Sequence, residues 1–319
     1  MKKLFGLLVA AASLMVILSG CGAPTLSVQS HHLNPDGLAA VVKGKSNQKN
    51  VQYVIKNGSH SEAQNNEAPI GLGGTDTISG AYAITVPTKA VKQTMRLSAG
   101  GKHQTVTIAK ANVLSDYSTL QNKYNQALTG TALSKKDQKL AAGMKKQAAD
   151  LKKTSEALKT NKATSMSAMQ AKAKQAQQIK TDAEKLKREQ IQLAGAMKQA
   201  QASVKDVLLP KNAKSGVNNL VKTKDFTIRT NVDNQKVVGI AMMVPTKGLK
   251  NKSQMKSFVM SFSILANSVG ANAKQVLKDF QKITKDKNKS STTTPKIHSN
   301  GLTFSLGYST TTLYIFITK

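Results

Sequence analysis

The chain contains 319 residues, with 47 Lys and Arg against 16 Asp and Glu, so its formal net charge is +31. It has one cysteine, no tryptophan and an aromatic content of 4%, which excludes an intrachain disulfide and argues against cores built on large aromatic rings. The length is enough for two or three domains. So basic a chain favours anionic partners, such as lipid headgroups or polyanions.

The first 20 residues have the order of an export signal. Two lysines, Lys2 and Lys3, precede an uncharged run over residues 4–18. This run of about 15 residues is shorter than the roughly 20 that cross a bilayer as a helix, and it matches the core of a signal peptide. We therefore predict that residues 1–20 are removed on export.

The uncharged run ends in the sequence Leu18-Ser19-Gly20-Cys21. This sequence resembles the lipobox of bacterial lipoproteins, in which a Leu and two small residues precede a lipid-modified Cys. The resemblance covers residues 1–21 only. It implies cleavage between Gly20 and Cys21, a diacylglyceryl thioether with palmitate-type chains on Cys21, and attachment to the extracellular face of the cell membrane. Two acyl chains anchor a protein stably, and an uncleaved anchor helix is the alternative.

Residues 21–24 then form the lipidated tether, and positive charge accumulates toward the C-terminus. Residues 25–111 contain 9 basic and 4 acidic residues, residues 112–208 contain 18 and 8, and residues 209–319 contain 18 and 4. Only three of the basic residues are Arg: Arg96, Arg188 and Arg229. Because Arg favours bidentate phosphate recognition, a field made mostly of Lys predicts diffuse attraction to polyanions. The alternative is that the charge serves solubility only.

Residues 25–111 have the pattern of an all-β domain. Short runs alternate apolar and polar residues or are rich in β-branched residues, and turn-forming clusters separate them. The runs are Thr25–Gln29, Leu38–Val42, Val51–Ile55, Ala81–Val86, Thr94–Ser98 and Thr105–Ile108. They predict a β-sandwich. The stretch 81–108 loosely resembles the closing strands of immunoglobulin-like modules, without the Cys and Trp of antibody domains, so the expected architecture is Ig-like.

Residues 112–208 predict a helical region. An apolar stripe ends at Gly130, and Ser134 with Asp137 three residues later is close to a capping box. A second helix follows to Asn161, and a third begins at Ser165 and keeps heptad spacing to about residue 208. The lengths favour an antiparallel coiled-coil hairpin with a break near residues 130–134, and a longer oligomeric coiled coil is the competing packing.

Residues 209–319 predict an α+β domain. Two strands around Asp233, two helices separated at Gly270, and two final strands from Leu302 to Ile317 follow in order. This order is typical of helices that pack on one antiparallel sheet. The predicted fold class is therefore multidomain: an all-β sandwich, an α-helical hairpin and an α+β domain.

The most suggestive local feature is a group of lysines in the last domain. The first three recur every four residues and share one helix face, which suits an anionic polymer. The group consists of Lys274, Lys278, Lys282, Lys285, Lys287 and Lys289. A solvated helix face is the alternative. No aromatic residues interleave with it to stack on bases, so we expect no specific nucleic acid.

Groups that carry catalysis or hold cofactors are scarce. His31 and His32 lie near Asp36, but a structural metal site needs three or four spaced ligands. We therefore expect no metal, no cofactor and no enzymatic activity. The favoured hypothesis is a surface-anchored binding or adhesion module for anionic wall polymer or a surface partner, on a Gram-positive cell. The alternatives are a structural lipoprotein whose hairpin pairs with another envelope protein, and, less favoured, a wall hydrolase.

Overall fold

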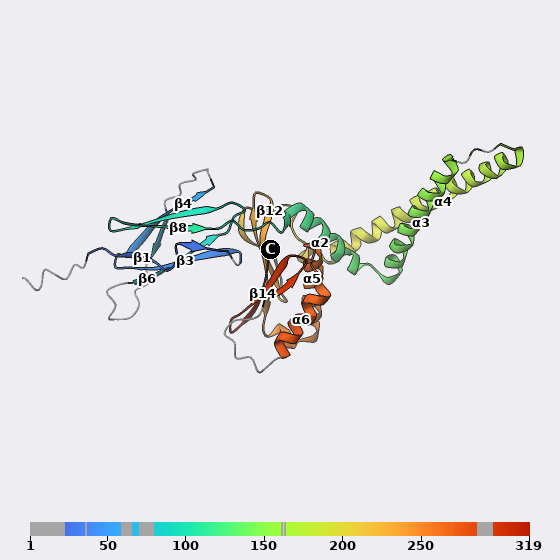
Figure 1. Cartoon of the computed structure of the whole chain (residues 1–319). Helices are drawn as coiled ribbons and strands as arrows, with labels where there is room; N and C mark the ends of the chain where they lie inside the picture. Colours follow the sequence, from blue (N-terminus) through green and yellow to red (C-terminus); the bar gives the residue numbers. More distant parts are fainter. Residues whose placement is uncertain are drawn as a thin grey trace, which may run out of the picture.

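The computed structural model describes residues 23–35, 37–58, 66–69, 80–160, 162, 164–285 and 296–319. The lipobox from Leu18 to Cys21 lies outside the described residues, so the export signal and lipid anchor stay predictions. Within the described part, the chain has mixed α/β content, with three sheets and five α-helices (Figure 1). None of those helices combines the length and apolar content needed to cross a membrane.

Two sheets share the N-terminal core. One has the order β1 (Leu26–Val28), β3 (Ala39–Ser46), β6 (Gly80–Pro87). The other has the order β2 (His32–Leu33), β8 (Lys102–Ile108), β7 (Gln93–Ala99), β4 (Asn50–Asn57), β5 (Asn66–Pro69). Alternate residues of β6 are buried and exposed along its whole length, so each sheet gives one face to the core. The buried members include Val42, Ile84, Met95, Leu97 and Val106.

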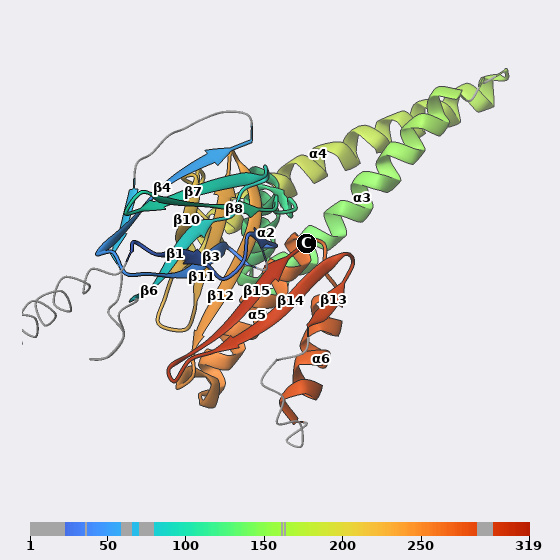
Figure 2. The same ribbon diagram turned by 60° about the vertical axis from the view of Figure 1, so that its left-hand side comes forward.

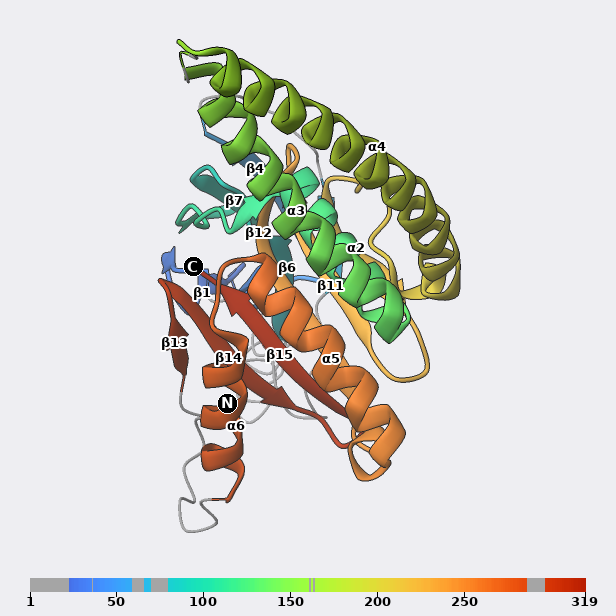
Figure 3. The same cartoon turned by 90° about the vertical axis from the view of Figure 1, so that its right-hand side faces the viewer.

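The C-terminal sheet is antiparallel throughout. Its order is β10 (Gly216–Lys222), β11 (Thr227–Asp233), β12 (Lys236–Pro245), β15 (Thr312–Thr318), β14 (Leu302–Tyr308), β13 (Ile297–Ser299), and β9 (Ser115–Asp116) pairs with β12. A short 3-10 helix, η3 (Gly248–Lys250), leads from β12 into the helices. One face of the sheet is covered by α2 (Tyr117–Ala132), α5 (Lys252–Ser268) and α6 (Ala273–Lys285), as Figure 3 shows.

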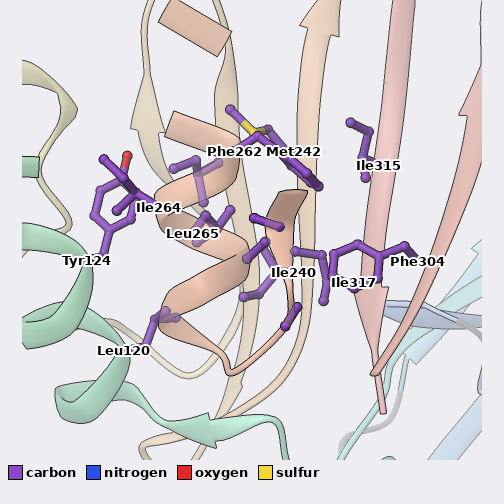
Figure 4. Close-up of a cluster of buried hydrophobic side chains, with 14 of the residues drawn as sticks. Leu120, Tyr124, Ile240, Met242, Phe262, Ile264, Leu265, Phe304, Ile315 and Ile317 are labelled. Atoms are coloured by element: carbon purple, nitrogen blue, oxygen red, sulfur yellow. The ribbon is translucent and has the colours of Figure 1, made fainter. Parts of the chain in front are cut away.

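The core beneath these helices includes α2, a helix from the stretch expected as the helical region, 112–208. Figure 4 shows Leu120 and Tyr124 of α2 packed beside Ile264 and Leu265 of α5. All four side chains belong to the same buried cluster as the sheet residues. The helix α2 therefore belongs to the C-terminal core, not to the hairpin. The periodicity of the sequence identified the apolar stripe of α2. It did not show whether the stripe packs on the C-terminal sheet or on α3 and α4.

Two helices, α3 (Lys135–Thr160) and α4 (Met166–Ser203), run side by side away from the rest of the molecule (Figures 1 and 3). We call this pair of helices the hairpin. One half of the capping box is present, since the Asp137 backbone N–H donates to Ser134 Oγ at 3.1 Å. In place of the other half, the Ser134 hydroxyl donates to the Asp137 carboxylate at 2.6 Å. Ser165 caps α4 by accepting from the Ala168 N–H at 3.2 Å. Both helices therefore begin where the sequence predicted.

The end of α4 differs from the prediction. The helix stops at Ser203 and a 3-10 turn, η2 (Lys205–Val207), follows, whereas the sequence predicted a helix to about residue 208. The reason lies in Leu209, whose side chain is buried in the C-terminal core. Its backbone N–H and C=O both bond to the side-chain amide of Asn125 on α2, at 2.9 Å each, so the chain leaves the helix early to reach that position.

Polar side chains join the N-terminal domain to the C-terminal sheet. One end of the N-terminal domain lies against β11 and β12 (Figure 2). The buried Asn231 side chain donates to the carbonyl oxygens of Leu38 at 2.8 Å and Thr88 at 2.6 Å. The Asp233 carboxylate accepts from the Ala90 N–H at 2.9 Å and pairs with Lys89 at 3.5 Å. Because these buried groups satisfy one another, the two domains form one head.

Candidate polyanion-binding surface

The helix α6 is fixed on the sheet by its apolar side. Asn272 caps it, as its Oδ1 accepts from the Gln275 N–H at 3.1 Å. Ala273, Val276 and Phe280 are buried, and the Phe280 ring lies 5.8 Å from that of Phe262 on α5. Residues three and four apart share a helix face, so this burial determines which residues of α6 point outward.

The three lysines expected to share a face are on the outward side of α6. Lys274, Lys278 and Lys282 are all exposed. Lys282 pairs with Asp279 at 3.5 Å, and Asp279 also accepts from the Gln275 side-chain amide at 2.9 and 3.0 Å. An exposed pair of this kind contributes little energy, so an anion competes with Asp279 for Lys282 at small cost.

Of the other three lysines of the predicted group, only the backbone of Lys285 lies within the described residues. Lys285 is the last residue of α6, and its side chain lies outside the described residues. Lys287 and Lys289 lie wholly outside them. The described part of the group is therefore the row on α6.

Sequence reasoning missed two lysines on the neighbouring helix. Lys252 and Lys256 are four residues apart near the start of α5 and both are exposed. Because α5 and α6 cover the same face of the sheet (Figure 3), these lysines extend the same helical layer. Their i, i+4 spacing was visible in the sequence. What could not be read there was the packing of α5 beside α6. We call the row Lys274, Lys278 and Lys282 on α6 the basic surface. Lys252 and Lys256 lie at the other end of α5 from the turn into α6.

The start of α5 carries a positive field of its own. Asn251 Oδ1 accepts from the N–H groups of Ser253 and Gln254, at 2.9 and 3.1 Å, so the helix has an ordered N-terminus with its partial positive charge. The nearby Asp225 carboxylate is engaged by the Gln254 side chain at 3.0 Å. The helical layer therefore carries two groups of lysines, and the carboxylate near each group, Asp225 or Asp279, is held by a glutamine amide.

One of the two histidines near Asp36 is engaged by the backbone: His31 Nδ1 lies 2.9 Å from the Thr105 carbonyl oxygen. Asp36 itself lies outside the described residues. Within the part of the chain that the structure describes, no three His, Cys, Asp or Glu side chains are grouped to hold a metal ion. The chemistry of the described surface is that of charge, supplied by lysines.

No protein-family model matches the chain, and no curated protein is significantly similar to it. The function must therefore be argued from the residues and their arrangement alone.

Proposed function

We propose that this chain is a membrane-anchored surface lipoprotein, held by a lipid on Cys21, that binds an anionic cell-wall polymer without catalysing a reaction. In this proposal the N-terminal pair of sheets is an Ig-like sandwich that acts as a spacer. The α3 and α4 pair is an antiparallel coiled-coil hairpin. The polymer contacts the basic surface of the C-terminal domain.

The observation that carries the proposal is the row Lys274, Lys278 and Lys282. Successive members are four residues apart, about one turn, so their ammonium groups follow a line at roughly 6 Å steps. A repeating polymer with regularly spaced phosphates or carboxylates meets such a line at several points. Weak single contacts then add, as they do when several lysines face one polyanion.

The position of the N-terminus supports display of this surface. The described chain begins at Ala23, two residues after Cys21. Its first strand, β1, lies in the N-terminal domain, on the far side of that domain from α5 and α6 (Figure 1). A chain anchored at Cys21 therefore holds the basic surface away from the bilayer by at least the length of one domain.

Sedimentation on isolated cell walls tests the binding. Residues 22–319, which contain every described element, are mixed with walls that keep or lack teichoic acid, at roughly 50 and 150 mM salt. We expect retention at the higher salt that requires the polymer. Replacing Lys274, Lys278 and Lys282 with Gln lowers the affinity roughly 10- to 100-fold, because each lysine near an anionic surface contributes up to about 1 kcal/mol.

A matched variant separates a specific surface from general charge. Lys145, Lys152 and Lys159 are exposed on α3, and replacing them with Gln removes the same net charge. The control should keep its affinity within about twofold. Equal losses in both variants, or no retention of the parent chain at roughly 150 mM salt, would contradict the proposed surface.

Membrane anchoring has its own test. The Cys21→Ser chain, expressed in a Gram-positive host, should lose incorporation of labelled palmitate and leave the membrane fraction, because one uncleaved apolar run is too short to span the bilayer well. Undiminished labelling of that variant would show that Cys21 is not the acceptor.

A further inference from the structure

The hairpin leaves much of its apolar seam incompletely covered. Among the described residues of α3 and α4, only Met144, Leu186 and Ala200 are buried. Five other seam residues of similar or larger apolar size remain half-buried: Leu151, Leu158, Ile179, Leu193 and Met197. In four-helix bundles the corresponding positions are closed by the facing helix pair, so two helices here supply only part of a bundle.

The uncovered seam opens into a groove between the two helices. Its volume is about 300 Å³, and Leu151 and Ile179 lie in its floor beside Thr154. Exposed or half-exposed polar side chains form its walls: Gln147 and Asp150 from α3, and Gln175, Gln178, Asp182 and Lys185 from α4. An apolar floor between polar walls is the form of site that accepts an amphipathic helix.

The two sides of the hairpin differ in charge. On the side away from the groove, Lys145, Lys152 and Lys159 each follow a seam residue of α3 and are seven residues apart. On the groove side, Asp150, Asp182 and Glu189 accompany Lys185, which pairs with Glu189 at 3.9 Å. The strong positive charge of the helical region is thus turned away from the groove, so two copies can meet there without opposing their lysine rows.

We propose that a second copy of this chain occupies the groove, so that two hairpins form an antiparallel four-helix bundle. A two-fold pairing sets Lys185 of each copy among the carboxylates of the other and closes the floor at Leu151 and Ile179. The hairpin projects clear of the head (Figure 1), which leaves the groove open to approach. Such an interface is self-complementary, as two-fold dimers require.

The available area is sufficient for a stable dimer. The shorter helix, α3, has 26 residues and extends about 39 Å, and a pair of helices is roughly 20 Å wide. The face that both helices share therefore offers roughly 800 Å², which matches the area per partner in a typical stable interface. The gain comes mainly from covering half-buried apolar side chains, which the free hairpin leaves in contact with water.

The test is the mass of residues 22–319 in solution by sedimentation equilibrium, from about 1 to 100 µM. The expected result is a monomer–dimer equilibrium that shifts toward dimer as salt rises, since salt screens repulsion between the basic chains and leaves apolar burial intact. Binding of a polyanion responds to salt in the opposite direction, so the two activities are distinguishable. A monomer over the whole range overturns the proposal and leaves the groove to a basic helix of another protein.

Two isosteric variants locate the interface. Gln178 lies in the groove wall, and the adjacent Gln177 points about 100° away from it on α4. Gln178→Glu combined with Gln147→Glu opposes added carboxylates across the two-fold axis and should weaken the dimer roughly tenfold or more. Gln177→Glu should leave it unchanged, and circular dichroism should show equal helix content in both. A dimer dissociation constant that the groove variant leaves unchanged would overturn the proposal.

Discussion

The head and the hairpin are built from similarly periodic sequences but differ in how completely they bury their apolar residues. In the C-terminal domain, the rings of Phe258, Phe280 and Phe304 each contact that of Phe262 within a continuous core. Along the 26 and 38 residues of α3 and α4, only three side chains are buried. Heptad spacing places apolar side chains on one face of a helix, whereas the size of those side chains decides how much apolar surface is removed from water.

This difference bears on function because the head covers its apolar residues with its own chain. Its domains are joined by buried hydrogen bonds at Asn231 and Asp233, so the basic surface sits on a rigid support. The hairpin, with its half-covered seam, gains most from association. We therefore expect mutations to separate the two regions clearly, and the following changes are ordered from the largest effect to the smallest.

Removing an aromatic ring from the centre of the head should have the largest effect. Phe262 is fully buried and contacts three other rings. Phe262→Ala leaves a cavity and should lower the free energy of unfolding by about 3–5 kcal/mol. Urea denaturation followed by tyrosine fluorescence measures this loss. A loss below about 1 kcal/mol would mean that the core collapses around the cavity or is not packed as described.

Alkaline pH should weaken the head specifically. Burial raises the pKa of Tyr82, Tyr117 and Tyr124 to about 12, and all three lie in the two cores of the head. Their contribution to stability is complete below pH 10, the ordinary pKa of tyrosine, and is lost as pH rises through 12. For the well-buried Tyr124, the shift corresponds to about 2–3 kcal/mol.

Tyrosinate absorbance measures this directly, since the chain has six tyrosines and no tryptophan. Three tyrosines should ionise only near pH 12, and head unfolding should accompany them. Titration of all six in a single step near pH 10, with the fold intact, would contradict the burial of these rings.

Loosening the polar contact between the two domains should have an intermediate effect. Asn231→Ala removes the side-chain donor of the buried Thr88 carbonyl oxygen, which costs about 1–3 kcal/mol. The Leu38 carbonyl oxygen loses the same donor but still accepts from the Thr88 backbone N–H. Each domain keeps its own core, so the loss should appear as motion between the domains, measured as a larger radius of gyration by X-ray scattering. The matched change Asn219→Ala, at an exposed position of β10, should leave the scattering curve unchanged.

The smallest effect is expected on the outer side of the hairpin. Met169 is 54% exposed on α4 and lies away from the groove, so Met169→Gln should change the free energy of unfolding by less than about 0.5 kcal/mol. A substantially larger loss of unfolding free energy, measured by thermal denaturation, would show that this side of α4 is covered in solution. The groove would then not be the open side of the hairpin.

Local signals in the sequence predicted most helix starts and many strands. Ser134 and Ser165 begin helices because their hydroxyls bond to backbone groups within three residues, a contact that spacing alone predicts. The strand β10 was missed, since its sequence contains adjacent Asn218 and Asn219 and lacks the usual strand composition. Its pairing with β11 is decided by tertiary contacts.

Long-range features were beyond sequence reasoning for a related reason. Asn231 bonds to Thr88, 143 residues earlier, and no local pattern marks an asparagine as the centre of a domain joint. The row of lysines on α6 was found by its four-residue period, but that α5 lies in the same helical layer as α6 could be seen only in the structure. The groove depends on how closely two alanine-rich helices approach, which periodicity does not determine.

Hydrogen–deuterium exchange of residues 22–319, at roughly 1 and 100 µM, tests the contrast between head and hairpin most directly. We predict strong protection in β11, β12 and α5 at both concentrations. Protection in α3 and α4 around Leu151 and Ile179 should be weak at the lower concentration and rise at the higher one, as the groove becomes covered. Hairpin protection that equals that of the head in dilute solution, with no dependence on concentration, would contradict the account.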